Sequence, residues 1–223
     1  MASPARTPAE RVPLSRERVL QAAMALADES GIESVTMRRL AQELGVEAMS
    51  LYHHVGSKDE LLGGLVDMVV AEIELPGGGS DWKEAIRRTA ISAHETFQRH
   101  PWAAAQVLSG PTLSLARLRY MDAILGSVRQ GGFTADLTDH AYHAIDSHIM
   151  GFTLWEIGIT AGIARLPGSV EGFLETFDAE AYPYLAEHID WHLREPSPDD
   201  EGEFAFGLRL ILDGLERLRT TSP

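Results

Sequence analysis

Hydrophobic residues recur every three or four positions through almost the whole chain, and no convincing run alternates apolar with polar residues. A repeat of three and four places apolar side chains on one face of an α-helix, whereas a half-buried β-strand needs a repeat of two. The 223-residue sequence therefore predicts an all-α protein. The expected helices span residues 15–30, 37–44, 47–54, 57–75, 81–99, 102–109, 111–130, 135–163 and 200–219, with one or two short helices in a variable segment at 164–199.

Glycine, proline and small polar residues divide these helices into groups. Gly31 and Gly45 are placed to stop the first two helices. Thr36 is a plausible N-cap, and Ser57 begins an S-x-x-E capping box. The stretch 76–80, PGGGS, has the composition of a connector. The predicted organisation is a flexible basic arm at 1–14, a head of three helices at 15–62 and a larger helical domain at 63–223.

The composition excludes several classes of protein. The chain has no cysteine, which rules out disulfides, thiolate zinc sites and cysteine nucleophiles. No apolar run approaches the roughly 20 residues that a membrane-spanning helix needs. The opening MASPARTPAERVPLSRER also lacks the apolar stretch of a secretory signal. We therefore expect a cytoplasmic protein with no membrane partner.

The charge is unevenly distributed along the chain. The net charge of −14 argues against non-specific binding to nucleic acid. However, residues 1–60 carry 7 basic and 9 acidic side chains, whereas residues 61–223 carry 12 and 24. The local field matters more to a DNA-binding face than the net charge of the whole protein. A near-neutral head with a basic arm is therefore compatible with DNA, and the arginines of the arm either enter an adjacent minor groove or stay disordered.

Two short helices joined by a glycine-containing turn form the pattern of a helix-turn-helix motif. In such a motif the second helix lies in the major groove with its first residues at base edges. Here residues 45–47 form the turn, and apolar residues on both sides would hold the helices together. The outward residues of the second helix are then Ala48, Met49, Ser50, Tyr52 and His53. The pattern by itself also allows a second interpretation, in which these residues complete a helical core.

Longer motifs in the head resemble one family of regulators. Residues 34–46 read SVTMRRLAQELGV, residues 50–55 read SLYHHV and residues 57–62 read SKDELL. These motifs resemble the tetracycline-repressor (TetR) family, and QGGF at 130–133, FAFGL at 204–208 and ILDGL at 211–215 resemble its C-terminal domain more weakly. The resemblance implies an all-α fold with an N-terminal three-helix helix-turn-helix DNA-binding domain and a C-terminal helical ligand-binding and dimerisation domain.

The resemblance also implies a function. It predicts a ligand-responsive transcriptional regulator, most often a repressor, that binds a palindromic operator in double-stranded DNA and is associated with the nucleoid when bound. Lys58 would begin a helix, where backbone amides already favour a phosphate. By position, the implied DNA-binding residues are Thr36 and Arg38 at the backbone or groove edge, Ala48, Met49, Ser50 and His53 at the bases, and Tyr52, His54 and Lys58 at phosphates.

The last helix and the helix at 135–163 are candidates for a homodimer interface. Apolar residues recur in the last helix at 204, 208, 211, 215 and 218, the 4-3-4-3 spacing of a coiled-coil seam, and Gly158 and Gly162 form a small-xxx-small pair. Family resemblance implies that two such helices from each subunit form a four-helix bundle. Packing within one chain is the alternative. The predicted interface residues are Gly158, Gly162, Phe204, Leu208, Ile211 and Leu215.

The expected effector is a small, mostly apolar molecule, because the larger domain combines aromatic and methionine residues with few polar groups. The candidate pocket residues are Met68, His94, Trp102, Gln106, Met121, His143, Asp146 and Phe152. Tetracycline repressors hold the magnesium of their drug with a histidine near the helix at 111–130. The comparable stretch at 105–110, AQVLSG, has no histidine, which argues against a magnesium–tetracycline effector.

No motif points to an enzyme, a cofactor or a metal. Gly-x-Ser-x-Gly is absent, and the glycines at 77–79 lack the Lys-Ser/Thr of a phosphate-binding loop. His188 and His192 are spaced like zinc ligands, but no glutamate follows His188 as in H-E-x-x-H. We therefore expect no catalytic, cofactor or metal site. The alternative function is a ligand-binding or scaffolding protein on the same fold without DNA affinity.

Overall fold

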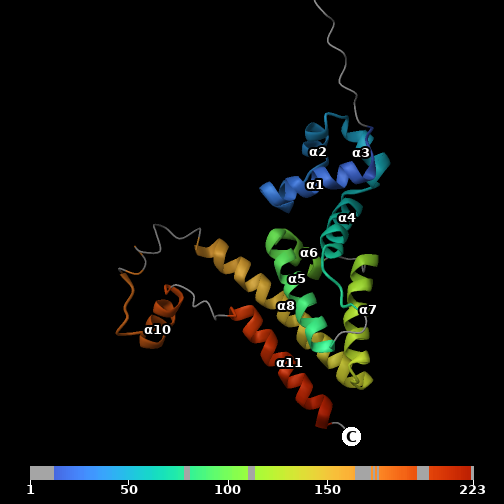
Figure 1. Ribbon diagram of the computed structural model, residues 1–223. Helices are drawn as coiled ribbons and strands as arrows, with labels where there is room; N and C mark the ends of the chain where they lie inside the picture. Colours follow the sequence, from blue (N-terminus) through green and yellow to red (C-terminus); the bar gives the residue numbers. More distant parts are fainter. Residues whose placement is uncertain are drawn as a thin grey trace, which may run out of the picture. The chain divides into compact units, whose positions relative to one another are not determined.

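The computed structural model describes residues 13–77, 81–109, 114–163, 172, 174, 176–194 and 201–221. Within these ranges the chain forms helices and no β-strand, which confirms the all-α prediction (Figure 1). Most of the arm and residues 78–80 of the connector lie outside the described residues. The helices are α1 (Arg16–Ser30), α2 (Met37–Leu44), α3 (Ala48–Val55), α4 (Lys58–Ala71), α5 (Trp82–Arg99), α6 (Pro101–Ser109), α7 (Leu115–Gln130), α8 (Ala135–Ile163), α10 (Pro183–His192) and α11 (Glu203–Thr221).

Most predicted helix bounds agree with the structure, and α8 spans the predicted residues throughout. The largest difference in the head is at α4, which was predicted to reach residue 75 but ends at Ala71. The chain leaves the helix there because the backbone amide of Glu74 donates to Ser92 Oγ of α5 at 2.9 Å instead of bonding within α4. In the described ranges no helix combines the length and apolar character needed to cross a membrane.

The chain divides into two compact units. The head unit contains residues 1–72 and 99–119, and the body unit contains residues 73–98 and 120–223. The predicted boundary between residues 62 and 63 falls inside the continuous helix α4. The head unit also contains α6, which the sequence had assigned to the C-terminal domain, because α6 packs on α1 and α4.

Side-chain caps begin three helices of the head unit, α1, α2 and α4. Ser15 Oγ accepts from the Arg18 amide at 3.2 Å, Thr36 Oγ1 from the Arg39 amide at 3.2 Å, and Ser57 Oγ from the Glu60 amide at 3.0 Å. These bonds satisfy amides that a helix N-terminus leaves without a partner. The predicted N-caps at Thr36 and Ser57 are therefore confirmed.

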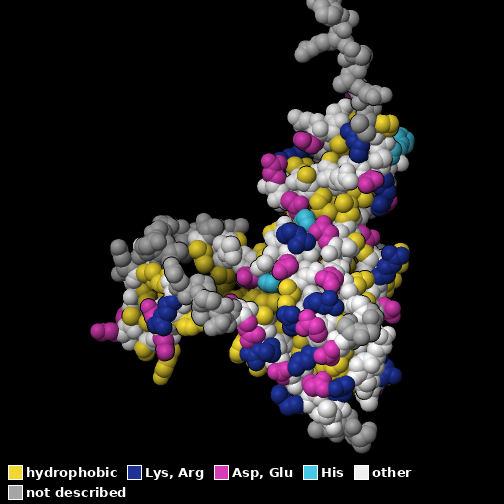
Figure 2. Space-filling view, viewed as in Figure 1, with side chains coloured by type: hydrophobic (Ala, Val, Ile, Leu, Met, Phe, Trp, Pro, Cys, Tyr) yellow, Lys and Arg dark blue, Asp and Glu magenta, His cyan; other side chains and the backbone are white. Residues whose placement is uncertain are grey.

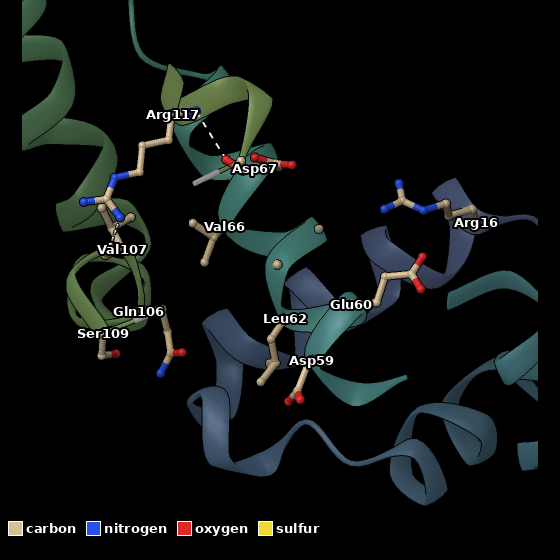
Figure 3. Close-up of a pocket in the computed structure, with 13 residues that line it drawn as sticks. Arg16, Asp59, Glu60, Leu62, Val66, Asp67, Gln106, Val107, Ser109 and Arg117 are labelled. Atoms are coloured by element: carbon tan, nitrogen blue, oxygen red, sulfur yellow. Dashed lines mark hydrogen bonds between the residues drawn. The ribbon is translucent and has the colours of Figure 1, made fainter. Parts of the chain in front are cut away.

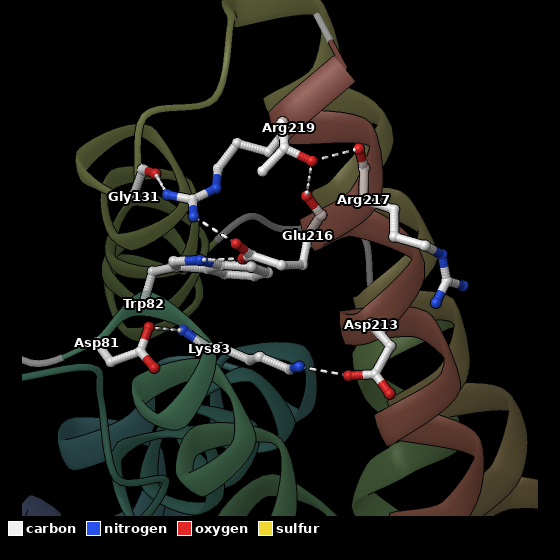
Figure 4. Close-up of polar contacts among 9 residues, drawn as sticks. Asp81, Trp82, Lys83, Gly131, Asp213, Glu216, Arg217 and Arg219 are labelled. Atoms are coloured by element: carbon white, nitrogen blue, oxygen red, sulfur yellow. Dashed lines mark hydrogen bonds and ion pairs between the residues drawn. The ribbon is translucent and has the colours of Figure 1, made fainter.

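Polar contacts join three segments of the body unit (Figure 4). Trp82 Nε1 at the start of α5 donates to Glu216 Oε2 of α11 at 3.0 Å. Lys83 forms an ion pair with Asp213 of α11. Arg219 Nη1 donates to the carbonyl of Gly131, in the turn between α7 and α8, at 2.6 Å. These contacts fix the C-terminal half of α11 against α5 and that turn.

The N-terminal half of α11 packs on α8. His148 Nε2 of α8 donates to the Phe204 carbonyl at 2.9 Å. A Cβ at Gly207 would lie 2.6 Å from Cε1 of the same His148 ring. Gly207 therefore allows a close approach of the two helices that no larger residue permits without a shift.

Candidate nucleic-acid interface and ligand cavity

A tight turn joins α2 to α3 and fixes the direction of α3. Gly45 has a φ of 66°, in the left-handed region that glycine adopts with little strain. Its amide donates to the Gln42 carbonyl, and the Val46 amide donates to the Ala41 carbonyl at 3.0 Å. These bonds close the C-terminus of α2 and send the chain directly into α3.

Buried side chains hold α3 against the other helices of the head unit. Leu40 of α2 and Leu51 and Val55 of α3 have no solvent exposure. α1 contacts both α2 and α3, and Arg39 Nη2 donates to Ser30 Oγ at the end of α1 at 3.1 Å. Apolar residues on both sides of the turn were expected to hold the two helices together, and Leu40 and Leu51 are buried accordingly, whereas Leu44 and Val46 are half-buried.

The opposite face of α3 has no covering segment among the described residues. Met49 is 71% exposed and Tyr52 is 42% exposed, although both are large and partly apolar. His53 is exposed beside them, and Ala48, Ser50 and His54 are half-buried. Figure 2 shows histidine side chains at the surface of this part of the molecule. The interpretation in which these residues complete a core therefore fails for Met49, Tyr52 and His53.

The remaining predicted DNA-binding residues flank α3. Arg38 and Lys58 are exposed, so both cations are accessible to a phosphate. Thr36 is also exposed, but its hydroxyl already accepts the Arg39 amide as the cap of α2. Lys58 is the first residue of α4. A phosphate bound at this end of α4 would therefore also meet backbone amides that attract an anion.

α3 itself carries almost no charge. Residues 48–55 contain no Asp, Glu, Lys or Arg, and the two histidines occupy its last turn. Glu47 precedes the helix without making a side-chain cap. A duplex placed on this face would therefore meet hydroxyl, imidazole and apolar groups, with cationic contacts coming from the flanking residues.

The predicted effector residues do not form one group, because they are divided between the two units. Met68, Trp102 and Gln106 lie in the head unit, and the other five lie in the body unit. Trp102 is committed to a structural contact, since its Nε1 donates to Asp28 Oδ1 of α1 at 2.7 Å. The same Asp28 oxygen lies 2.8 Å from His100 Nδ1. Gln106 lines a cavity in the head unit.

That cavity has a volume of about 540 Å³ and lies between α4, α6 and the start of α7 (Figure 3). Sequence reasoning missed one of its three acidic residues, Asp67, although an aspartate within the apolar stretch LLGGLVDMVVA of α4 was a usable signal. Asp67 Oδ1 is enclosed and accepts no hydrogen bond within the described part of the chain. The described lining residues are Arg16, Asp59, Glu60, Leu62, Gly63, Gly64, Val66, Asp67, Gln106, Val107, Ser109, Ser114 and Arg117.

His94 and Phe152 of the body unit belong to a packed aromatic cluster. The His94 ring stacks on Phe204 of α11 with centroids 4.0 Å apart, and Phe152 lies at its edge. His94 Nδ1 lies 2.8 Å from Thr153 Oγ1, which donates its own proton to the Ile149 carbonyl. Burial lowers the pKa of His94, and Glu156 opposes part of that shift. The cluster fills space in the unit's interior, with His94 as a neutral donor.

Three other predicted pocket residues of the body unit have different surroundings. Asp146 accepts from the hydroxyls of Tyr120 and Tyr142 at 3.3 and 3.4 Å. Burial, reinforced by Asp146, raises the pKa of Tyr120 well above its ordinary value, so this hydroxyl stays protonated. His143 is exposed and faces Asp139 one turn away at 3.7 Å. Met121 is half-buried on α7.

The residues predicted for the dimer interface divide into two sets. Gly158 and Gly162 are exposed and line a shallow apolar hollow on α8 with Trp155, Ile159 and their neighbours. Phe204, Leu208 and Leu215 of α11 are instead buried within the chain, and Ile211 is half-buried. The apolar residues that α11 exposes are Phe206, Leu210 and Leu218.

Comparisons with known proteins identify the class to which this geometry belongs. The family of bacterial regulatory proteins known as the tetR family matches residues 19–65, which contain the helix-turn-helix motif. The family described as the tetracyclin repressor-like C-terminal domain matches residues 75–219, more than half of the chain. The chain therefore belongs to the TetR family and is a ligand-responsive transcriptional regulator with an N-terminal helix-turn-helix.

Three similar proteins illustrate the relationship. The HTH-type transcriptional repressor DrrR1 of Streptomyces coeruleorubidus is 32% identical over 220 residues, covering 92% of this chain and 78% of the relative. The crystal structure of a possible TetR family transcriptional regulator from Streptomyces coelicolor A3(2) matches with a TM-score of 0.73 and 31% identity, over 92% of this chain and all of the other. The Streptomyces coelicolor TetR family protein ActR in complex with actinorhodin matches with a TM-score of 0.70 and 27% identity, over 93% and 99%.

Proposed function

We propose that this chain is a repressor whose homodimer binds a palindromic operator through α3 and is released by a small-molecule effector. The observation that carries the proposal is the two-sided character of α3. Leu51 and Val55 are fully buried, while Met49 and Tyr52 stand in solvent on the opposite face. Large side chains held outward on a rigid helix suit the major groove, where base edges and thymine methyl groups offer matching contacts.

The flanking cations supply affinity. Lys58 and Arg38 are accessible, and each phosphate contact releases counterions and makes binding depend on salt. The contacts of α3 with bases supply discrimination, about 1–3 kcal/mol for each good pair of hydrogen bonds. We assign Tyr52, His54 and Lys58 to phosphates and Ala48, Met49, Ser50 and His53 to base edges, with Thr36 at the groove edge.

Dimerisation explains a palindromic operator. A two-fold axis places two copies of α3 on successive major grooves, roughly 34–36 Å apart. The exposed apolar residues Trp155 and Ile159 of α8 and Phe206 and Leu210 of α11 offer the surface for this pairing, with Gly158 and Gly162 permitting close approach. This surface replaces most of the α11 seam expected from the sequence, because the chain itself covers Phe204, Leu208 and Leu215.

Release by an effector follows from a difference in affinity. A ligand that binds the DNA-free conformation more tightly than the DNA-bound conformation lowers operator affinity by the same factor. A coupling of about 1–3 kcal/mol corresponds to a weakening of roughly 5- to 150-fold. ActR in complex with actinorhodin provides a relative with a bound small molecule. We place the action of this regulator in the cytoplasm, on DNA, and assign it no catalytic activity.

The test is operator binding by matched variants. A palindromic fragment would be selected from genomic DNA, and its affinity measured by fluorescence anisotropy over a range of salt concentrations. Tyr52→Ala and Lys58→Ala should each weaken binding, and Lys58→Ala should also reduce the salt slope by about one. Arg87→Ala removes the same charge from an exposed i,i+3 ion pair in the body unit and should bind normally.

Two results would contradict the proposal. Unchanged binding by both head variants would show that α3 is not the recognition surface. Selection of no fragment by the wild-type protein would favour the alternative, a ligand-binding protein on this fold without DNA affinity.

A further inference from the structure

The cavity of the head unit contains an uncompensated carboxylate. Asp67 lies in the interior of α4, between residues that face the core of the unit. Its Oδ1 is shielded from solvent without accepting a hydrogen bond, and no described cation pairs with the carboxylate. A shielded carboxylate oxygen without a donor is energetically costly, because the folded chain does not replace the water that it loses.

The other polar groups of the cavity do not relieve this cost. Arg117 Nη1 donates to the Val107 carbonyl at the end of α6, and in Figure 3 its guanidinium points toward Val107 and away from Asp67. Arg16 lies with Glu60 on the other side of α4 in the same view. Ser109 Oγ donates to the Ala105 carbonyl at 2.8 Å. The charged lining residues are the acids Asp59, Glu60 and Asp67 and the arginines Arg16 and Arg117, so acids outnumber cations by one.

The walls next to Asp67 are apolar and open. Leu62 and Val66 of α4 face Val107 and Gln106 of α6 across the cavity (Figure 3). Gly63 leaves a gap in the α4 wall, since a Cβ built there meets no atom within 4 Å. A volume of about 540 Å³ falls within the range of drug-sized ligand sites. The lining therefore combines an apolar slot with one free acceptor.

We propose that this cavity is a binding site for an amphipathic organic cation, a primary or secondary amine attached to an aromatic or other apolar body. The ammonium group pairs with the negative charge of the Asp67 carboxylate, and the apolar body lies between Leu62, Val66 and Val107. The amide of Gln106 is placed to hydrogen-bond a polar substituent of that body. No residue of α5 or α8 lines the site among the described residues, so the head unit builds it alone.

The site is connected to the DNA-binding surface through α4. Lys58 begins this helix, and the lining residues Asp59 and Glu60 follow it directly. Gly64 of α4 packs closely against α1, because a Cβ built at Gly64 would be 2.8 Å from Leu20 Cδ2. A ligand that separates α4 from α6 must therefore move either α1 or the first turn of α4. This regulatory part of the inference rests on the proposed function, whereas ligand binding does not.

Binding is tested without DNA. Isothermal titration calorimetry of the full chain would use three probes of similar shape: 2-(1-naphthyl)ethylamine, 2-(1-naphthyl)ethanol and 1-naphthylacetate. The ammonium probe should bind, the alcohol should bind at least about tenfold more weakly, and the carboxylate should not bind. Equal binding of all three probes, or no binding of the amine at millimolar concentration, would overturn the proposal.

Two variants test whether the amine binds in this cavity. Asp67→Asn should weaken the amine about tenfold or more without loss of folding, since it removes an unpaired charge from the interior. Gly63→Leu should abolish binding by filling the slot, and its helical position tolerates the side chain. Ala25→Leu places the same side chain at an exposed position of α1 and should bind normally. Retention of amine binding by both cavity variants would show that the ligand lies elsewhere.

The regulatory effect is tested separately by anisotropy on the selected operator. The amine should weaken operator binding by wild-type protein and leave the Gly63→Leu complex unchanged. An amine that binds the cavity but leaves operator affinity unchanged in both proteins would refute the regulatory coupling while leaving the site established. Failure of the wild-type protein to bind any operator would count against the proposed function and not against the amine site.

Discussion

α3 and α11 both turn one apolar face inward, but their outer faces differ. The outer face of α3 combines Met49 with Tyr52 and His53, whereas the outer face of α11 carries Phe206 and Leu210. Groups that can both hydrogen-bond and make apolar contacts suit base edges and phosphates. Exposed apolar side chains suit another protein surface, and here Arg209 lies over the Phe206 ring at 5.0 Å as a polar rim. We therefore expect two helices with similar internal anchoring to serve different partners, DNA for α3 and, as proposed above, a second subunit for α11.

The largest expected effects separate the two faces of α11. Leu208→Asp places a charge at a fully buried position and should destabilise the subunit by about 3–5 kcal/mol, because the carboxylate has no partner there. Leu210→Asp changes a position that is 52% exposed and should leave a folded monomer. Urea unfolding followed by circular dichroism measures the first effect, and sedimentation velocity measures the second.

The opposite pattern would break the comparison. A folded monomer from Leu208→Asp, with an unchanged dimer from Leu210→Asp, would restore the seam that the sequence predicted and remove the distinction between the inner and outer faces of α11.

The next largest effects separate the two faces of α3. Leu51→Ala empties a fully buried position and should cost about 2–4 kcal/mol of unfolding free energy. Met49→Ala should change stability by less than about 0.5 kcal/mol, since the side chain is exposed, yet weaken operator binding. Chemical denaturation and anisotropy on the same preparations distinguish these outcomes. Equal effects of the two variants on stability would mean that Met49 is part of the core.

The sequence predicted α3 more accurately than α11 for a physical reason. Gly45 and Ser57 bound a short helix with few apolar residues. Few rotations of this helix about its axis are therefore possible, and only one of them brings Leu51 into the core. In α11 apolar residues occur on both faces, so the spacing could not show whether Phe204 or Phe206 pointed inward. That choice depends on His148, whose bond to the Phe204 carbonyl and contact with Gly207 fix the rotation of α11.

The candidate ligand residues show the same limit. Residue type alone suggested aromatic and polar side chains as pocket residues. Only the tertiary structure shows that Trp102 donates its hydrogen bond to Asp28 and that His143 is exposed to solvent. Gln106 was the predicted residue that lines the head cavity. Asp67 was missed because what sets it apart is a shielded carboxylate oxygen without a hydrogen-bond donor, which is visible only in the structure.

Substituting the glycines that orient α3 and α11 should change the free energy of unfolding by less than the core substitutions above. Gly45→Ala forces a side chain into the left-handed region and should cost about 1–2 kcal/mol. Gly207→Ala must displace His148 and should also destabilise, although the backbone there is helical. Gly214→Ala is the matched control within α11, because its Cβ would make only an ordinary contact, and it should stabilise the helix by up to about 1 kcal/mol. Thermal unfolding ranks the three, and a stabilising Gly207→Ala would refute the close packing of α8 and α11.

The smallest expected effect is the pH dependence that His94 gives to the packing of α11. Burial lowers the pKa of His94 below its ordinary value of 6.5, so the unfolded chain binds a proton more readily than the folded chain. Stability from this residue is therefore complete above about pH 6.5 and is lost as the pH falls below that value, with a slope of at most about 1.4 kcal/mol per pH unit. Urea unfolding between pH 7.5 and 5 should show this loss in the wild-type protein and a flatter curve in His94→Gln. A wild-type curve that rises toward low pH would mean that the charged ring is favoured by Glu156, 3.4 Å away, and that the stack on Phe204 holds an imidazolium rather than a neutral donor.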